Sequence, residues 1–257
     1  MSETPSLSIY PDLGDRVYHL IREQILSGKM PPGSLLLGVE LARVIGVSRT
    51  PVADALNVLA TEGLVEIVPR KGYYVTSLSI HDYRELMDAR LAIELAVVER
   101  MDITQQQLAV LQEAHATVGE CAAAKGSARD CQELIRRNVC FHELLVDGST
   151  NRYLVELYRR LSARIHLAYT HFSLAAPLRP VHDSVQEHAA IMTALAAGDL
   201  VALKVAVAEH VEHTTEFYTT NTPEPPPSQP VTEKNVATSP SRRLPWLGRN
   251  HPATAQG

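Results

Sequence analysis

The stretch from Leu41 to Val75, LARVIGVSRTPVADALNVLATEGLVEIVPRKGYYV, decides the fold of the N-terminal part of the chain. Apolar residues recur at helical spacing on both sides of Gly46, and Gly63 follows the longer of the two patterns. Glycine ends helices because it adopts a left-handed backbone without strain. Two short helices joined by a tight turn that contains glycine make a helix-turn-helix. In such a motif the first residues of the second helix face the DNA major groove; here they are Ser48, Arg49 and Thr50.

Two β-rich runs follow this motif, at residues 64–68 and 72–76, and they predict a hairpin. Its tip carries two cations, Arg70 and Lys71, and then Gly72. Glycine lets the backbone approach a ligand closely, and cations at a phosphate release counterions from DNA. An ordinary solvated turn is the alternative for the tip taken alone. Its position directly after a helix-turn-helix favours a DNA-binding wing.

Composition limits what this DNA contact can be. The chain has 257 residues, enough for two domains, and a formal net charge of −5, which argues against a broad basic surface for nucleic acid. No apolar run is long enough for a membrane span, the N-terminus lacks a signal-peptide pattern, and the three cysteines lack zinc-type spacing. We therefore expect a cytoplasmic protein whose DNA contacts depend on a few local cations: Arg43, Arg49, Arg70 and Lys71.

Beyond Ser79 the apolar spacing is helical almost without interruption up to about Tyr218. Six long helices with short connections predict an all-α bundle. The expected fold is therefore mainly α, with a winged helix-turn-helix followed by an all-helical bundle. The final residues are rich in Pro, Ser and Thr and cannot bury a core. The predicted divisions are a mobile N-terminus at 1–13, the winged helix at 14–77, the bundle at 78–220 and a disordered tail at 221–257.

Three histidines of the bundle stand out by their spacing. His142 follows Asn138 by four residues, so both side chains project from one helix face. His188 and His210 lie on the last two predicted helices, whose short connection can bring them opposite each other. Three imidazoles and one oxygen suit a divalent transition metal such as Zn, Ni or Mn. The alternative is that each histidine is an ordinary surface or core residue. No paired carboxylate or second base is evident from spacing, which indicates a structural metal rather than a hydrolytic one.

Several motifs resemble the GntR family of bacterial transcription regulators. GVSRTPVADAL and EGLVEIVPRKGYYV are similar to its winged helix. DARLAIELAVVER, NVCFHELL and EHAAIMTALAAGDLVAL are similar to the FCD ligand-binding domain of its FadR-type branch. The resemblance implies DNA contacts from Ser48, Arg49 and Thr50 and a wing tip at Gly72. For the second domain it implies an antiparallel bundle of six or seven helices. It also implies a metal, most simply Zn, with this ligand set: Asn138, His142, His188 and His210.

The chain departs from the family pattern at positions that bear on binding. Ala53 and Val39 stand where the family usually has arginine. Losing these cations predicts weaker DNA binding or an atypical operator sequence. Asn138 stands where the family usually has aspartate, and its neutral oxygen predicts weaker metal affinity. Arg90 lies within a family motif, and we expect it to pair with an effector carboxylate; an ion pair with Glu94 at i+4 is the alternative.

The sequence thus predicts a homodimeric transcription regulator, most simply a repressor, that binds a pseudo-palindromic operator. A small organic acid bound in the metal-containing bundle would control its affinity for DNA. Two rival interpretations remain at this level. One is a metalloenzyme whose winged helix is vestigial, and the other is a regulator that responds to metal alone.

Overall fold

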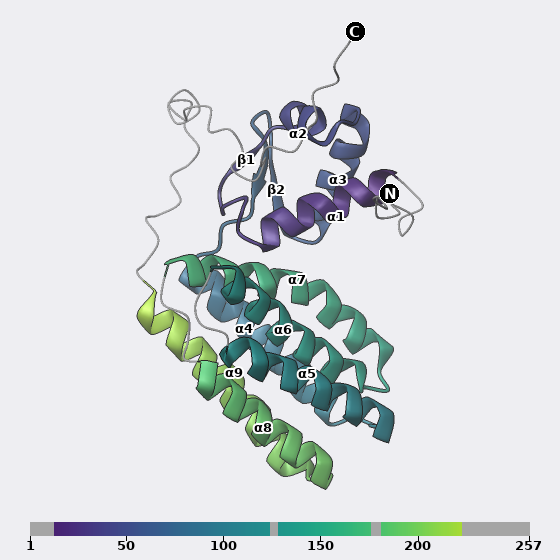
Figure 1. Ribbon diagram of the computed structural model, residues 1–257, viewed down its shortest axis with the longest axis vertical. Coiled ribbons are helices and arrows are strands. Elements are labelled where there is room, and N and C mark those ends of the chain that lie inside the picture. The colour runs from purple at the N-terminus through teal and green to yellow at the C-terminus, as the bar shows by residue number, and fades with distance from the viewer. Residues whose placement is uncertain (1–12, 124–127, 176–180, 223–257) are drawn as a thin grey trace, which may run out of the picture. The chain divides into compact units, whose positions relative to one another are not determined.

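A computed structural model describes residues 13–123, 128–175 and 181–222 of the chain (Figure 1). The predicted mobile N-terminus lies outside this range up to residue 12, and the predicted tail lies outside it from residue 223. The last helix reaches Asn221, so it includes the first residue that the sequence assigns to the tail.

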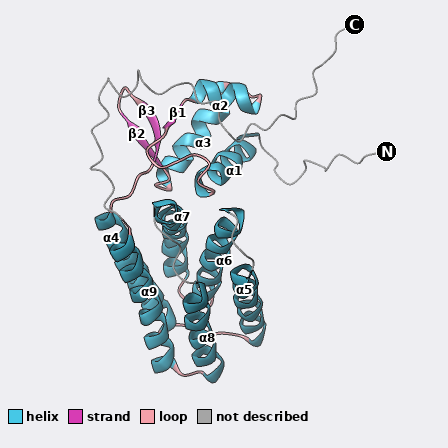
Figure 2. Ribbon diagram, turned by 60° about the vertical axis from the view of Figure 1, so that its left-hand side comes forward, coloured by secondary structure: helices cyan, strands magenta, loops and turns pink. Residues whose placement is uncertain are grey.

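The N-terminal part combines three helices with a small antiparallel sheet whose strand order is β1-β3-β2 (Figure 2). The predicted helix-turn-helix and hairpin are both present. The first strand, Leu35–Leu36, was not predicted, because two residues are too short to show an alternating pattern; it pairs with Tyr74 and Tyr73 of β3. The elements are α1 (Leu13–Leu26), β1 (Leu35–Leu36), α2 (Gly38–Ile45), α3 (Arg49–Thr61), β2 (Val65–Val68) and β3 (Gly72–Val75).

Glycine geometry and apolar burial hold the helix-turn-helix in shape. Gly46 ends α2 in a left-handed conformation with φ 79°, and its N–H donates to the carbonyl of Ala42 at 3.0 Å. α1 packs against α3 through fully buried side chains such as Ile21 and Leu56. Burying one such side chain stabilises the fold by about 1.5–3 kcal/mol. The packing therefore fixes α3 while its N-terminal turn stays exposed.

Six helices make up the rest of the described chain, as the apolar spacing predicts (Figure 2). Ser79 begins the first of them with a capping box, in which its hydroxyl accepts from the N–H of Asp82 and the Asp82 carboxylate accepts from the N–H of Ser79. Asp199 caps the last, accepting from two backbone N–H groups. The helices are α4 (Ile80–Val98), α5 (Gln105–Ala123), α6 (Ala128–Asp147), α7 (Arg152–Ala175), α8 (Val181–Ala197) and α9 (Leu200–Asn221).

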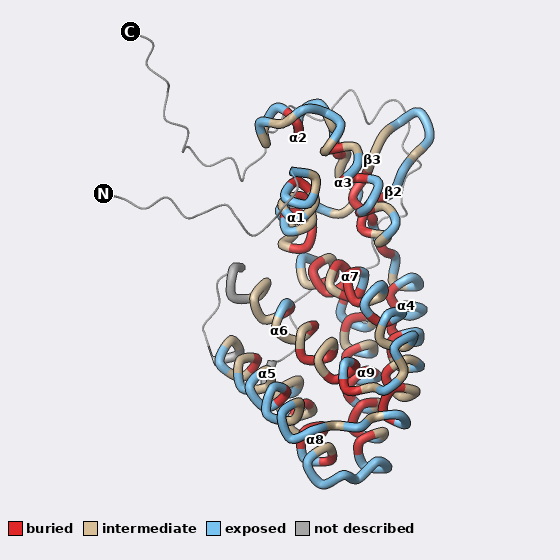
Figure 3. The backbone as a smooth tube through the Cα atoms, turned by 90° about the vertical axis from the view of Figure 1, so that its right-hand side faces the viewer, coloured by how far each residue is buried: buried red, intermediate tan, exposed pale blue. Residues whose placement is uncertain are grey.

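The helices bury one face each and expose the other (Figure 3). α8 packs against both α9 and α5, and α4 packs against α9 and α7. Two apolar clusters result, and α4, α6 and α9 contribute to both. Polar groups carried inward on these helices must find partners within the bundle, because an unpaired buried polar group is destabilising. Across the described residues, none of the helices combines the length and apolar character needed to cross a membrane.

Candidate metal centre and nucleic-acid interface

Three histidines from three helices meet inside the bundle, as their spacing predicts. His142 on α6, His188 on α8 and His210 on α9 are each at most 1% exposed. The Nε2 atom of His142 lies 3.2 Å from Nε2 of His188 and 3.0 Å from Nε2 of His210. All three rings therefore direct the same nitrogen to one point.

Burial keeps these rings neutral. Desolvation, together with the nearby Arg90 charge, lowers the pKa of His142 to about 3. Desolvation also lowers the pKa of His188 and of His210, with neighbouring imidazoles contributing at His188. A neutral imidazole has a free lone pair on one ring nitrogen, which is the form that binds metal ions.

Two of the three rings have a carboxylate near Nδ1, the nitrogen that faces away from the meeting point. Nδ1 of His210 lies 2.9 Å from Oε2 of Glu187, and Nδ1 of His142 lies 3.4 Å from Oε2 of Glu94. The second distance is long for a hydrogen bond, but both carboxylates favour a proton on the Nδ1 that faces them. In a neutral ring that proton leaves Nε2 as a lone pair. The Nε2 atoms of His142 and His210 would then face each other as lone pairs at 3.0 Å, an arrangement that a cation between them would stabilise.

The donor set fits a transition metal. Bond lengths of about 2.0–2.1 Å place two donor nitrogens about 2.9 Å apart at a right angle and about 3.3 Å apart at a tetrahedral angle. The two Nε2 separations fall within this range. The three histidines also form the group of potential metal ligands found among the described residues. Asn138 lies one turn before His142 on α6 and is half-buried, and its place in the ligand set stays a prediction.

Arg90 is fully buried on α4 and makes the ion pair that the sequence offered as an alternative. Its Nε donates to Oε1 of Glu94 at 2.7 Å, and Nη1 donates to the hydroxyl of Tyr169. Tyr158 donates to the same Glu94 oxygen at 2.7 Å. Burial alone would raise the pKa of Glu94, but the charge of Arg90 lowers it overall, so the carboxylate stays ionised. The Nη2 atom of Arg90 is buried and has no hydrogen-bond partner in the described structure.

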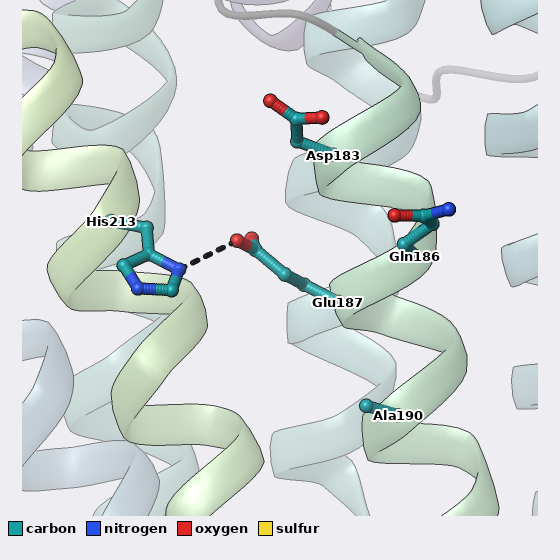
Figure 4. Close-up of a pocket in the computed structure, with 5 residues that line it drawn as sticks. All are labelled: Asp183, Gln186, Glu187, Ala190 and His213. Carbon is teal, nitrogen blue, oxygen red and sulfur yellow. Dashed lines mark hydrogen bonds and ion pairs between the residues drawn. The ribbon is translucent and has the colours of Figure 1, made fainter.

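The sequence interpretation that no paired carboxylate accompanies the histidines was therefore wrong. Spacing offered Glu94 only as a partner of Arg90, and Glu187 gave no signal beyond standing next to His188. Glu94 accepts hydrogen bonds from Arg90 and Tyr158, and Glu187 contacts His210 and His213. Neither carboxylate is therefore free to act as a general base. An open pocket lies on the outer side of Glu187, lined by Asp183, Gln186, Glu187, Ala190 and His213 (Figure 4).

The predicted DNA-reading residues lie on the surface of the N-terminal part. Ser48 is the N-cap of α3, yet its hydroxyl makes no capping bond, and Arg49 and Thr50 are exposed beside it. At the wing, Arg70 has a left-handed φ of 65°, which helps to turn the hairpin. The remaining predicted contacts are exposed or half-buried: Arg43 on α2, Lys71 at the hairpin tip and Gly72 at the start of β3.

A contact that the sequence did not reveal ties the wing to α3. The hydroxyl of Tyr73 on β3 donates to Oδ1 of Asn57 on α3 at 2.9 Å. Both residues are polar and surface-lying, so neither shows a pattern in the sequence. The bond helps to keep the hairpin and the helix in one orientation.

Comparison with known proteins agrees with this architecture. Residues 13–75 match the family model "Bacterial regulatory proteins, gntR family", and residues 85–213 match the FCD domain. The chain is 30% identical over 205 residues to an uncharacterized HTH-type transcriptional regulator, YdhC, of Bacillus subtilis, covering 77% of this chain and 88% of that protein. It is 28% identical to the transcriptional repressor RspR of Escherichia coli over 79% of this chain and 88% of RspR.

Solved structures share the fold. A putative GntR transcriptional regulator from Rhodococcus sp. RHA1 superimposes with a TM-score of 0.70 at 23% identity, covering 80% of this chain and 97% of that one. Fold, family models and relatives together define a DNA-binding transcription regulator and not an enzyme. The chain belongs to the GntR family and carries an FCD domain.

Proposed function

We propose that the protein is a homodimeric repressor whose operator affinity is controlled by a small organic acid bound at a metal ion in the bundle. The convergence of three buried, neutral Nε2 atoms carries this proposal. His142, His188 and His210 would hold the ion, with Asn138 as a fourth, neutral ligand. Zn fits the donor set best, and Ni or Mn would fit as well. The metal would supply a Lewis-acidic point for a carboxylate.

The charge balance near the centre favours an anionic effector. A divalent ion and Arg90 contribute three positive charges, and Glu94 and Glu187 contribute two negative ones. The buried Nη2 of Arg90 still offers hydrogen bonds, and guanidinium groups bind carboxylates well. The ion pair with Glu94 and the contact with an effector are thus compatible, because they use different nitrogens of Arg90. The gluconate operon transcriptional repressor of Bacillus licheniformis, which is 29% identical to this chain over 168 residues, is named for gluconate, an organic acid of this class.

At the other end of the chain, Ser48, Arg49 and Thr50 would contact bases and Arg43, Arg70, Lys71 and Gly72 would contact the backbone of a pseudo-palindromic operator. A dimer places two such readers on two half-sites. Effector binding would change operator affinity through the bundle, and linkage requires that DNA change effector affinity equally.

The test is a DNA-binding titration with a duplex that the full-length protein selects from random DNA. Fluorescence anisotropy is followed while organic acids are added with Zn²⁺ or with a chelator. We expect an acid that releases the protein from DNA only when Zn²⁺ is present. Release by Zn²⁺ alone would instead support a regulator that responds to metal only. If chelation changes neither DNA binding nor the acid response, the metal has no role in control.

A further inference from the structure

Glu187 on α8 contacts two histidines of α9 at once. Its Oε2 lies 2.9 Å from Nδ1 of His210, and its Oε1 lies 2.8 Å from Nδ1 of His213 (Figure 4). The His210 side chain is 1% exposed, whereas that of His213 is 54% exposed. Glu187 therefore links a buried ring of the histidine centre to a ring at the surface.

The chemistry of these contacts fixes the orientation of His210. An ionised carboxylate only accepts hydrogen bonds, so Nδ1 of His210 carries its proton. In the neutral ring, Nε2 is then a lone pair, and it points at Nε2 of His142. The contact from His213 holds the other oxygen of Glu187, which restrains the carboxylate in the plane where it meets His210.

Of the other two histidines of the centre, His142 has a longer carboxylate contact and His188 has none in the described chain. Nδ1 of His142 is 3.4 Å from Glu94, whose other oxygen is shared between Arg90 and Tyr158. Nδ1 of His188 is buried without a hydrogen-bond partner in the described chain, and its ring is instead stacked on Phe141 at 4.2 Å between centroids. Glu187 thus makes the shorter of the two carboxylate–histidine contacts at the centre.

We propose that Glu187 is a positioning residue of the metal centre and that His213 holds it in place. The inference rests on the metal binding proposed above. A carboxylate behind a metal-bound imidazole fixes the ring and strengthens its donation to the ion, and losing it typically weakens metal affinity by about 10–100-fold. His213 extends this chain of contacts to the pocket at the surface.

The test measures Zn²⁺ affinity of the full chain by competition with a chromophoric chelator. Glu187→Ala should weaken binding by about 10–100-fold. Glu187→Gln should lie between this variant and the wild type, because its amide oxygen still accepts from His210 but carries no charge. His213→Ala should give a smaller loss than Glu187→Ala. Glu212→Gln is the matched control, since it removes an exposed carboxylate beside His213 and should leave affinity unchanged.

A second readout separates positioning from a general structural role. In the metal-free protein, histidine side-chain ¹⁵N NMR should show one tautomer of His210 in the wild type and a mixture in Glu187→Ala. Circular dichroism and a urea midpoint for each variant establish that the bundle is folded. A Glu187→Ala protein that is less stable but keeps the His210 tautomer and the Zn²⁺ affinity would overturn the inference.

The two proposals fail in different ways. His142→Ala should abolish Zn²⁺ binding; a wild type that binds no Zn²⁺ would remove the proposed metal function. A wild type that binds Zn²⁺ as tightly as Glu187→Ala would leave the metal function standing and remove only the role of Glu187.

Discussion

The proposed DNA-reading face and the histidine centre are built in opposite ways. Ser48, Arg49 and Thr50 are consecutive and exposed, and they depend on α3 only for their placement. The centre draws His142 and His188 from separate helices and buries both completely. An exposed site can change without disturbing the core, whereas each group of a buried site is also part of the core. Substitutions at the first site should therefore change binding without changing stability, whereas substitutions at the second should change both.

The largest effect should come from breaking the buried ion pair beside the centre. Glu94→Ala leaves Arg90 buried without its carboxylate, so we expect the free energy of unfolding to fall by about 3–5 kcal/mol. Urea denaturation followed by circular dichroism measures this loss. Arg160→Ala is the control, because its ion pair with Glu156 is exposed and should contribute no more than about 0.5 kcal/mol. Equal losses in the two variants would contradict the contrast between buried and exposed sites.

At the DNA face, Arg49→Ala should reduce operator affinity without reducing stability. A lost arginine–base contact corresponds to about 1–3 kcal/mol, or roughly a 5–150-fold rise in Kd. Fluorescence anisotropy with the selected duplex measures affinity, and the urea midpoint should stay that of the wild type. Arg84→Ala, an exposed arginine on α4, is the charge-matched control. Unchanged DNA binding in Arg49→Ala would show that α3 does not read the groove as proposed.

Acidity should destabilise the bundle through His166, a half-buried histidine on α7. Burial, with the nearby charges of Arg22 and Arg136, lowers the pKa of His166 to about 4. The unfolded chain takes up this proton near pH 6.5, so the free energy of unfolding falls as pH drops from about 6.5 toward 4. Because the side chain is only partly buried, His166→Gln should remove on the order of 1 kcal/mol of this loss between about pH 7 and pH 5.

Urea denaturation of the wild type and His166→Gln, both without metal, measures that difference. His166 lies outside the histidine centre, so the variant leaves the proposed ligands intact. An identical pH dependence in the two proteins would mean that His166 is as easily protonated in the folded state as in the unfolded chain.

The smallest effect should come from the wing. Arg70→Asn removes one charge and keeps a residue that tolerates the left-handed backbone found there. We expect slightly weaker binding to every sequence and a salt dependence whose slope falls by about 1. Anisotropy titrations at several salt concentrations measure the slope. A selective loss for one sequence would instead assign Arg70 to base recognition.

The same contrast explains what could be predicted from the sequence. The helix-turn-helix and wing are local, so glycine positions and apolar spacing were sufficient to place Gly46 and the hairpin. The six bundle helices and the meeting of His188 with His210 followed from helical spacing and a short connection. Strand β1 is too short to show a pattern.

The contacts around the histidines could not be predicted, because they depend on how helix faces meet. Glu187 touches His210 across two helices, and Tyr158 and Tyr169 reach the Arg90–Glu94 pair from α7. The spacing of residues within one helix cannot predict contacts between different helices. The ion pair itself was open to prediction, since Arg90 and Glu94 stand four residues apart.

The connection at Gly198 and Asp199 has a consequence for how the centre assembles. Gly198 adopts φ 67° and Asp199 caps α9, so α8 and α9 form a hairpin with contacts close in sequence. Such local contacts close at a small loss of chain entropy. Bringing His188 and His210 together therefore closes a shorter stretch of chain than bringing His142 on α6 to either of them. The turn at Gly198 and Asp199 thus lowers the chain-entropy cost of bringing two of the three histidines together.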